Sequence, residues 1–181
     1  MPDSYLIEYC APTLAGIKTG SLFSFDTDSK EESTKEIIKL NRMLRKKGLR
    51  AIPLRRNNKR TLLYLYRPSH LANDLKNIEI KEILSNKGYC CENPDFCLVQ
   101  LIKRLSSDKT FPHEIGLFLS YPPFDVKCFM NNPMGQAKCF GCWKVYGNKK
   151  EAEVIFEKYK KCTEFLKNEH KKGKTLTQLV V

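Results

Sequence analysis

Apolar residues recur every three or four positions in three long stretches of the chain, which is the spacing of one helix face. In the first stretch Ile37, Leu40 and Leu44 share a face, and the following Gly48 is typical of a helix end. The pattern predicts long helices over 30–47, 92–105 and 148–168. Shorter helices are expected over 68–75, 77–86, 123–132 and 171–179.

Short apolar and aromatic runs between these helices predict strands over 21–25, 49–56, 60–68, 116–121 and 142–147. The second and third runs are joined by "NNK" (57–59), whose residues tolerate turn conformations, so they predict a hairpin. Pro53 places the first strand of that hairpin at a sheet edge or at a bulge. We therefore expect a single mixed α/β domain over 1–181, with a sheet of about five strands that includes the hairpin and is flanked by helices.

The length of 181 residues is enough for a domain that buries about 70% of its unfolded surface, so the core needs no metal or disulfide. No apolar run reaches the roughly 18 residues of a membrane helix. The first residues, "MPDSYLIEYC", lack the charge and apolar core of a signal peptide. These features predict a cytoplasmic protein without a membrane partner, and its eight cysteines are then expected to be thiols.

The net charge of +12 is unevenly distributed along the chain. No acidic residue occurs from Ile37 to Asn73, where eleven residues are Lys or Arg. Such a region attracts anions and indicates either a nucleic-acid site, a site for an acidic protein partner, or simply a solvated basic face. The candidate contacts are Arg42, Arg45, Lys46, Lys47, Arg50, Arg55, Arg56 and Arg60.

The segment "KCFGCWKVYG" (138–147) contains two cysteines, Cys139 and Cys142, at the spacing of metal ligands and of redox pairs. The residues that follow are typical of a strand, so the helix end that lowers a thiol pKa in many redox motifs is not expected. A zinc site needs two further ligands, which Cys128 and His113 would supply if the fold brought them close. A metal site, a thiol site and a plain turn before a buried strand all remain open.

The segment "YCAPTLAGIKTG" (9–20) is rich in small residues and is expected to be a loop. One interpretation is a ligand pocket in which Cys10 reacts and Lys18 supplies a cation; the alternative is a segment that packs the N-terminus. The patterns of a P-loop and of a dinucleotide fingerprint are both missing from it.

His113 and Glu114 are the best candidates for acid–base catalysis, because histidine exchanges protons near neutral pH. The alternative is a histidine that only fixes a loop. Tyr121 and Trp143 could stack a flat cofactor such as flavin or haem, although aromatic residues are more often part of a core. No cofactor is identified, and His70 and His170 are expected to be exposed.

Three motifs together resemble one known family. They are "CAPTLAGIKTGSLF" (10–23), "FPHEIGLFLSYPPFDV" (111–126) and "KCFGCWKVYG", which a helix with "FEKYKKC" (156–162) follows. In this order, over nearly the whole chain, they resemble the DUF3793 family of anaerobic Firmicutes and their relatives. The resemblance implies a bacterial cytosolic protein, and the family carries no mechanism to transfer.

The favoured hypothesis is a protein that binds a small molecule or cofactor, or that depends on thiols for a redox or metal function. It predicts that the segments holding Cys10, Lys18, His113, Cys139 and Cys142 converge on one pocket. The alternatives are a nucleic-acid-binding module that uses the region 39–60, or an accessory partner of an acidic redox protein such as a flavodoxin. Whether the protein is an enzyme, and its oligomeric state, stay open.

Overall fold

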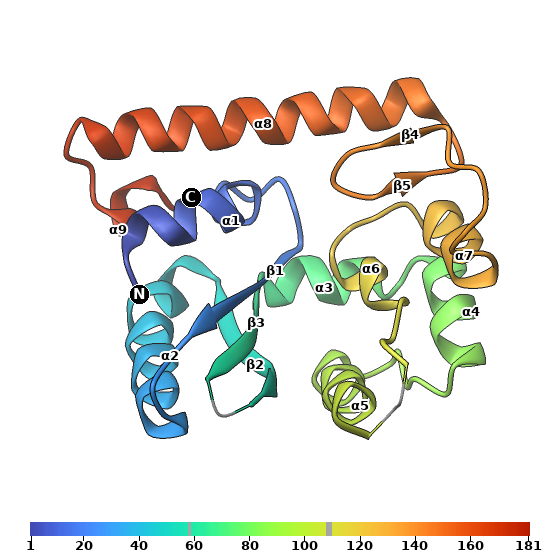
Figure 1. The fold of residues 1–181 in the computed structure, drawn as a ribbon, viewed down its shortest axis with the longest axis horizontal. Helices are drawn as coiled ribbons and strands as arrows, with labels where there is room; N and C mark the ends of the chain where they lie inside the picture. The colour runs from blue at the N-terminus through green and yellow to red at the C-terminus, as the bar shows by residue number, and fades with distance from the viewer. Residues whose placement is uncertain (58, 108–109) are drawn as a thin grey trace.

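The computed structural model describes residues 1–57, 59–107 and 110–181. Its main sheet has three antiparallel strands in the order β1-β3-β2, and a separate hairpin forms a second, two-stranded sheet (Figure 1). The strands are β1 (Gly20–Asp26), β2 (Arg50–Arg56), β3 (Arg60–Tyr66), β4 (Cys139–Phe140) and β5 (Lys144–Val145). The mixed α/β class is confirmed, whereas the prediction of about five strands in one sheet is wrong.

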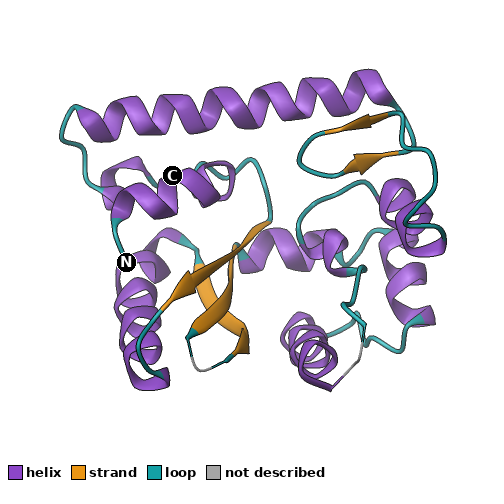
Figure 2. Cartoon of the chain, viewed as in Figure 1, coloured by secondary structure: helices purple, strands orange, loops and turns teal. Residues whose placement is uncertain are grey.

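Helices make up most of the regular structure, as Figure 2 shows. They are α1 (Asp3–Leu14), α2 (Lys30–Leu44), the 3-10 helix η1 (Arg45–Lys47), α3 (Pro68–Asp74), α4 (Ile78–Asn86), α5 (Pro94–Ser107), α6 (Ile115–Phe118), α7 (Pro123–Asn131), α8 (Lys149–Lys171) and α9 (Leu176–Leu179). The helices predicted from apolar spacing are confirmed with ends that differ by up to three residues, except that the helix expected over 171–179 is reduced to α9. Among the residues that the structure describes, no helix has the length and apolar composition needed to cross a membrane.

The hairpin of β2 and β3 is confirmed, although its predicted turn includes position 58, which lies outside the described residues. Strand β2 is an edge strand, and its register shifts between Pro53 and Arg55, as the proline predicted. The side-chain amide of Asn41 on α2 bonds both the N–H and the C=O of Ala51, each at 2.8 Å. The helix thus satisfies part of the strand edge that would otherwise be open to pairing.

Helices cover both faces of the main sheet. Side chains alternate between the two faces along each strand, so each strand contributes to both hydrophobic clusters. Phe23, Leu63 and Leu65 face α1 and α2 in one hydrophobic cluster. Tyr64 and Tyr66 face the opposite side, where α3 to α7 supply a second cluster. Helix α8 runs along α1 and reaches over the small hairpin, so it connects the two ends of the molecule (Figure 1).

Two local predictions are wrong, and a third is confirmed only in part. The expected loop at 9–20 is helical as far as Leu14, where α1 ends. The expected strand at 116–121 is the short helix α6 followed by a tight turn at Ser120, whose φ is 59°. The expected strand at 142–147 is reduced to β5. Short apolar runs do not distinguish a buried strand from a buried helix, which explains the error at α6.

Arg67 belongs to the basic region of the sequence but is buried, with 9% exposure. Its guanidinium donates to the carbonyl oxygens of Thr13 (2.9 Å), Leu14 (2.8 Å) and Val181 (2.6 Å). The first two are carbonyls of the last turn of α1, which have no partner inside the helix. Arg67 therefore connects the end of α1, the start of α3 and the last residue of the chain.

We expect Arg67→Met to lower the free energy of unfolding by about 2–4 kcal/mol, because three carbonyl oxygens lose a charged donor at once. Arg60→Met, at the opposite end of β3, is the matched control, since the Arg60 side chain is 62% exposed. It should change the free energy of unfolding by less than about 0.5 kcal/mol. Urea unfolding followed by circular dichroism measures both, and equal effects would contradict the role given to Arg67.

Candidate functional site

The carboxylate of Asp125 joins the small hairpin to helix α7. One oxygen, Oδ2, accepts the indole N–H of Trp143 at 2.7 Å. The other, Oδ1, accepts the backbone N–H groups of Tyr146 (2.8 Å) and Gly147 (2.7 Å). Asp125 lies in the first turn of α7, which begins with Pro123, and an acidic side chain is favourable at that end of a helix. The side chain is 4% exposed, so these donors compensate for the loss of water.

Helix α8 holds the other side of the hairpin. The Trp143 ring packs edge-to-face on Phe156, with ring centroids 4.5 Å apart, and lies 5.0 Å from the ring of Tyr121. A side chain at Gly141 would place its Cβ 2.2 Å from the Phe156 ring. The glycine between the two cysteines is therefore required for close approach of the helix.

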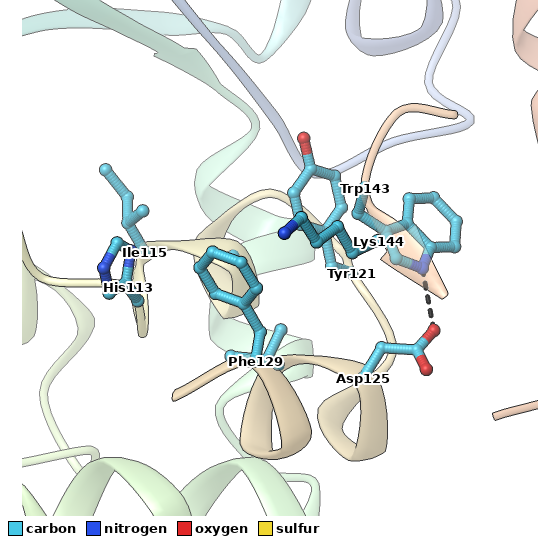
Figure 3. Close-up of a pocket in the computed structure, with 9 residues that line it drawn as sticks. His113, Ile115, Tyr121, Asp125, Phe129, Trp143 and Lys144 are labelled. Atoms are coloured by element: carbon cyan, nitrogen blue, oxygen red, sulfur yellow. Dashed lines mark hydrogen bonds between the residues drawn. The ribbon is translucent and has the colours of Figure 1, made fainter. Parts of the chain in front are cut away.

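A cavity of about 250 Å³ lies between α6, α7 and β5. We call it the aromatic cavity. Its lining residues are His113, Ile115, Gly116, Tyr121, Asp125, Val126, Phe129, Trp143 and Lys144. Figure 3 shows Phe129 between His113 and Lys144, and the imidazole of His113 meets the Phe129 ring edge-to-face at 4.9 Å. The walls are thus mostly apolar and aromatic, with a few polar groups, which is typical of small-molecule sites.

Lys144 supplies a positive charge to the aromatic cavity. Its Nζ donates to the carbonyl oxygen of Pro133 at 2.9 Å and lies 5.4 Å from the centre of the Phe129 ring. In the described part of the chain, no carboxylate oxygen lies within 4.0 Å of this nitrogen. An ammonium group has three donors, so Lys144 can still bond an anionic group in the cavity.

The structure brings three of the residues singled out from the sequence, His113, Tyr121 and Trp143, to the aromatic cavity. Lys18 does not line it. Its Nζ lies 5.4 Å from the Tyr121 ring, close to a separate groove. Cys139 packs against the cluster that contains Trp143. Residues of the sequence motifs therefore lie around the rings of Tyr121 and Trp143.

The geometry gives no support to the catalytic roles considered for Cys10 and Glu114. Cys10 is fully buried in α1, and burial raises the pKa of its thiol. Glu114 is buried beside the cavity but does not line it. Its Oε1 accepts from the guanidinium of Arg104 at 2.8 Å and from the hydroxyl of Tyr89 at 3.0 Å. Both residues thus stabilise the core.

The cysteines in the structure are free thiols. Cys139 is half-buried and Cys142 exposed, and among the described residues no three His, Cys, Asp or Glu side chains are grouped closely enough to hold a metal ion. Neighbouring groups desolvate the Cys142 thiol and raise its pKa, which nearby Lys18 only partly opposes. A raised pKa leaves less thiolate at neutral pH, so this thiol is not activated.

The predicted anion contacts lie at both ends of β2. Arg42, Arg45, Lys46, Lys47 and Arg50 surround the end of α2 and the start of the strand, whereas Arg55, Arg56 and Arg60 lie at the far end. Most of these side chains are exposed. Several of them are engaged within the chain: Lys47 donates to the Val180 carbonyl and Arg56 to the Thr34 hydroxyl, both at 3.1 Å, and Arg60 Nε lies 3.9 Å from the Asp26 carboxylate. The nucleic-acid and acidic-partner hypotheses stay predictions.

Six of the lining residues were not singled out from the sequence, and three of these, Asp125, Phe129 and Lys144, supply charge or an aromatic ring. An acidic residue after "PP" at the start of a helix is a local signal, but it is also common in ordinary helix starts. The contact of Asp125 with Trp143 spans 18 residues, and apolar spacing does not predict it.

A comparison of the sequence with models of protein families shows which family the chain belongs to. The model described as "Protein of unknown function (DUF3793)" matches residues 6–180. The chain belongs to the DUF3793 family. The match covers every residue of the aromatic cavity, which lies within 113–144. No curated protein and no solved structure matches the DUF3793 chain, so the site is interpreted from its own geometry.

We expect Asp125→Ala to release Trp143 from α7, because three N–H groups lose their acceptor. The free energy of unfolding should fall by about 1–3 kcal/mol. Trp143 is the single tryptophan of the chain and is 8% exposed, so its fluorescence should shift to longer wavelength and become several-fold easier to quench with acrylamide. Asp95→Ala, which removes an exposed carboxylate from the first turn of α5, is the matched control. Unchanged emission in Asp125→Ala would contradict the anchoring role.

Proposed function

We propose that this DUF3793 protein binds a small planar organic acid in the aromatic cavity. The observation that carries the proposal is the combination of aromatic walls with the Lys144 ammonium, which no carboxylate within 4.0 Å neutralises among the described residues. A flat apolar body would pack between Phe129 and Trp143, and its acidic group would accept from Lys144.

The polar groups of the cavity favour an anion over a cation. Both oxygens of Asp125 already accept hydrogen bonds from the chain, so this carboxylate has little capacity left for a ligand. His113 is packed against Phe129 and provides a ring nitrogen that can donate or accept. Lys144 therefore determines the charge that the cavity selects.

The size of the cavity favours a small ligand. Sites for drug-sized molecules usually occupy about 300–1,000 Å³, and the aromatic cavity is below that range. Its floor is fixed by Gly116, where a Cβ would lie 2.9 Å from the Val126 side chain. A single aromatic ring with a short acidic arm is the ligand class that fits this space.

Fluorescence of Trp143 tests the proposal, because the only tryptophan of the chain lines the cavity. Phenylacetate serves as the acidic probe and 2-phenylethanol as its neutral counterpart. We expect a saturable change in emission with phenylacetate. Lys144→Met should weaken phenylacetate binding about tenfold, the equivalent of 1.4 kcal/mol, because it removes a charge-assisted hydrogen bond. Binding of phenylethanol should change less than about twofold.

Lys138→Met is the matched control for Lys144→Met. Lys138 directly precedes β4 of the same hairpin. It is exposed and donates to the Gly147 carbonyl, but it does not line the cavity. Its replacement by Met therefore changes the net charge by the same amount without removing a group from the cavity. We expect it to leave phenylacetate binding unchanged. The proposal is wrong if neither probe changes the emission of Trp143 saturably, or if both lysine variants weaken phenylacetate to the same degree.

A further inference from the structure

The arginines of the chain are concentrated in one region. Six of the eight lie between positions 42 and 60, whereas the lysines are spread over the whole chain. The other two arginines hold the core, since Arg67 donates to carbonyl oxygens and Arg104 to the carboxylate of Glu114. Lysine and arginine carry the same charge, but only the planar guanidinium binds an oxyanion through two parallel hydrogen bonds. The distribution therefore indicates a partner with oxyanion groups.

Helix α2 presents part of this set along one side. Lys35 and Arg42 are seven residues apart, which is two helical turns, and Lys46 follows four residues later. Arg45 comes three residues after Arg42 and four after Asn41, and its N–H still bonds the Asn41 carbonyl as in an α-helix. The Asn41 side chain bonds the edge strand β2, so Arg45 lies on the side of α2 that adjoins this strand.

Strand β2 adds a further guanidinium to this side of the helix. Nη1 of Arg56 donates to the hydroxyl of Thr34, the residue before Lys35, at 3.1 Å. We call Lys35, Arg42, Arg45, Lys46 and Arg56 the α2 basic face. Four of them are exposed and Arg56 is half-buried. In the part of the chain that the structure describes, no carboxylate oxygen lies within 4.0 Å of their side-chain nitrogens.

The acidic side chains of α2 leave this charge largely uncompensated. Glu36 pairs with the N-terminal ammonium, and Glu32 accepts the N–H of Asp28 at 2.8 Å. These two glutamates are four residues apart and share a different stripe of the helix. Glu31, one turn before Lys35, is exposed and marks the end of the α2 basic face.

We infer that the α2 basic face binds the phosphate backbone of double-stranded DNA. The eleven residues from Lys35 to Lys46 correspond to about 16 Å along the helix axis. A single phosphate group would contact only a small part of this array, whereas about 16 Å of a duplex carries about nine phosphate charges. A polymer of phosphates therefore matches the length of the face, and its charge is opposite.

The residues around the face favour a duplex over a single strand. No aromatic residue occurs between Phe25 and Tyr64, so the face lacks the rings on which single-stranded bases stack. The polar side chains beside it, Thr34 and Asn41, already bond within the chain, so they are not free to contact the 2′-hydroxyls of RNA. Charge is what the face offers, so we expect DNA binding without sequence preference.

The salt dependence of DNA binding tests the inference on the wild-type protein. The probe is a labelled DNA duplex of about 20 base pairs, followed by fluorescence anisotropy between about 50 and 200 mM salt. We expect the logarithm of the binding constant to fall against the logarithm of the salt concentration with a slope of about −3, as for three or four neutralised phosphates. Unlabelled duplex should displace the probe at least about tenfold more effectively than polyglutamate of equal charge.

Two double variants locate the binding surface. Arg42→Gln/Arg45→Gln should weaken DNA binding at least about tenfold at the lowest salt and bring the slope closer to zero by about two. Lys76→Gln/Lys87→Gln removes the same charge from exposed positions after α3 and α4 and should change binding less than about twofold. Figure 1 shows α2 at the opposite end of the molecule from α7 and the small hairpin, so Trp143 emission should stay unchanged in both variants.

Four results would overturn the inference. The first is wild-type protein that does not bind the duplex, or binds it without a salt slope. The second is equal weakening in the arginine and lysine variants. The third is displacement by polyglutamate as effective as by DNA, which would indicate an acidic protein partner. The fourth is tighter binding of single-stranded DNA or of an RNA duplex of the same sequence.

Discussion

The candidate site depends on one buried carboxylate. Asp125 accepts three N–H groups from a hairpin whose two strands have only two residues each, and so short a hairpin has little stability of its own. A buried carboxylate in turn needs such donors, because it has lost its water. The hairpin and the carboxylate therefore stabilise each other, and Trp143 takes a defined position over α7. The shape of the aromatic cavity follows from this position.

Helix α8 extends this constraint to the rest of the molecule. In its first half, Ala152 and Tyr159 pack in the cluster of the hairpin, and in its second half Leu166 packs in the cluster that covers the main sheet. The same helix thus holds both the cavity and the α1 region, where Lys18 lies. Tyr121 is common to both places, since it lines the aromatic cavity and its ring contacts the Lys18 ammonium. Tyr121 therefore connects the aromatic cavity to the region around Lys18.

The long helices could be predicted from the sequence because their apolar spacing repeats over several turns, as in α2 and α8. The segment that contains Cys10 was misassigned because Pro12 and Gly16 are typical of loops. Pro12 is tolerated near the end of α1, where Arg67, 55 residues further along the chain, completes the hydrogen bonding of the last turn. The residue pattern around Pro12 does not predict this contact with Arg67.

Part of the cavity could be predicted from residue type alone, since His113, Tyr121 and Trp143 are unusual enough to be singled out. Phe129 and Lys144 could not, because an aromatic residue in a helix and a lysine in a strand are ordinary. Their significance comes from a ring and an ammonium placed 5.4 Å apart by α7 and β5, which only the folded chain shows. Sequence separation, and not residue chemistry, limited the prediction.

The most direct test follows the indole N–H of Trp143 in ¹H–¹⁵N correlation spectra. The chain has one tryptophan, so a single indole peak reports on the bond to Asp125 and on the cavity together. We expect a peak that exchanges slowly with solvent and moves saturably when phenylacetate is added. An indole peak that exchanges as fast as that of an exposed tryptophan, or that stays in place at saturating phenylacetate, would contradict it.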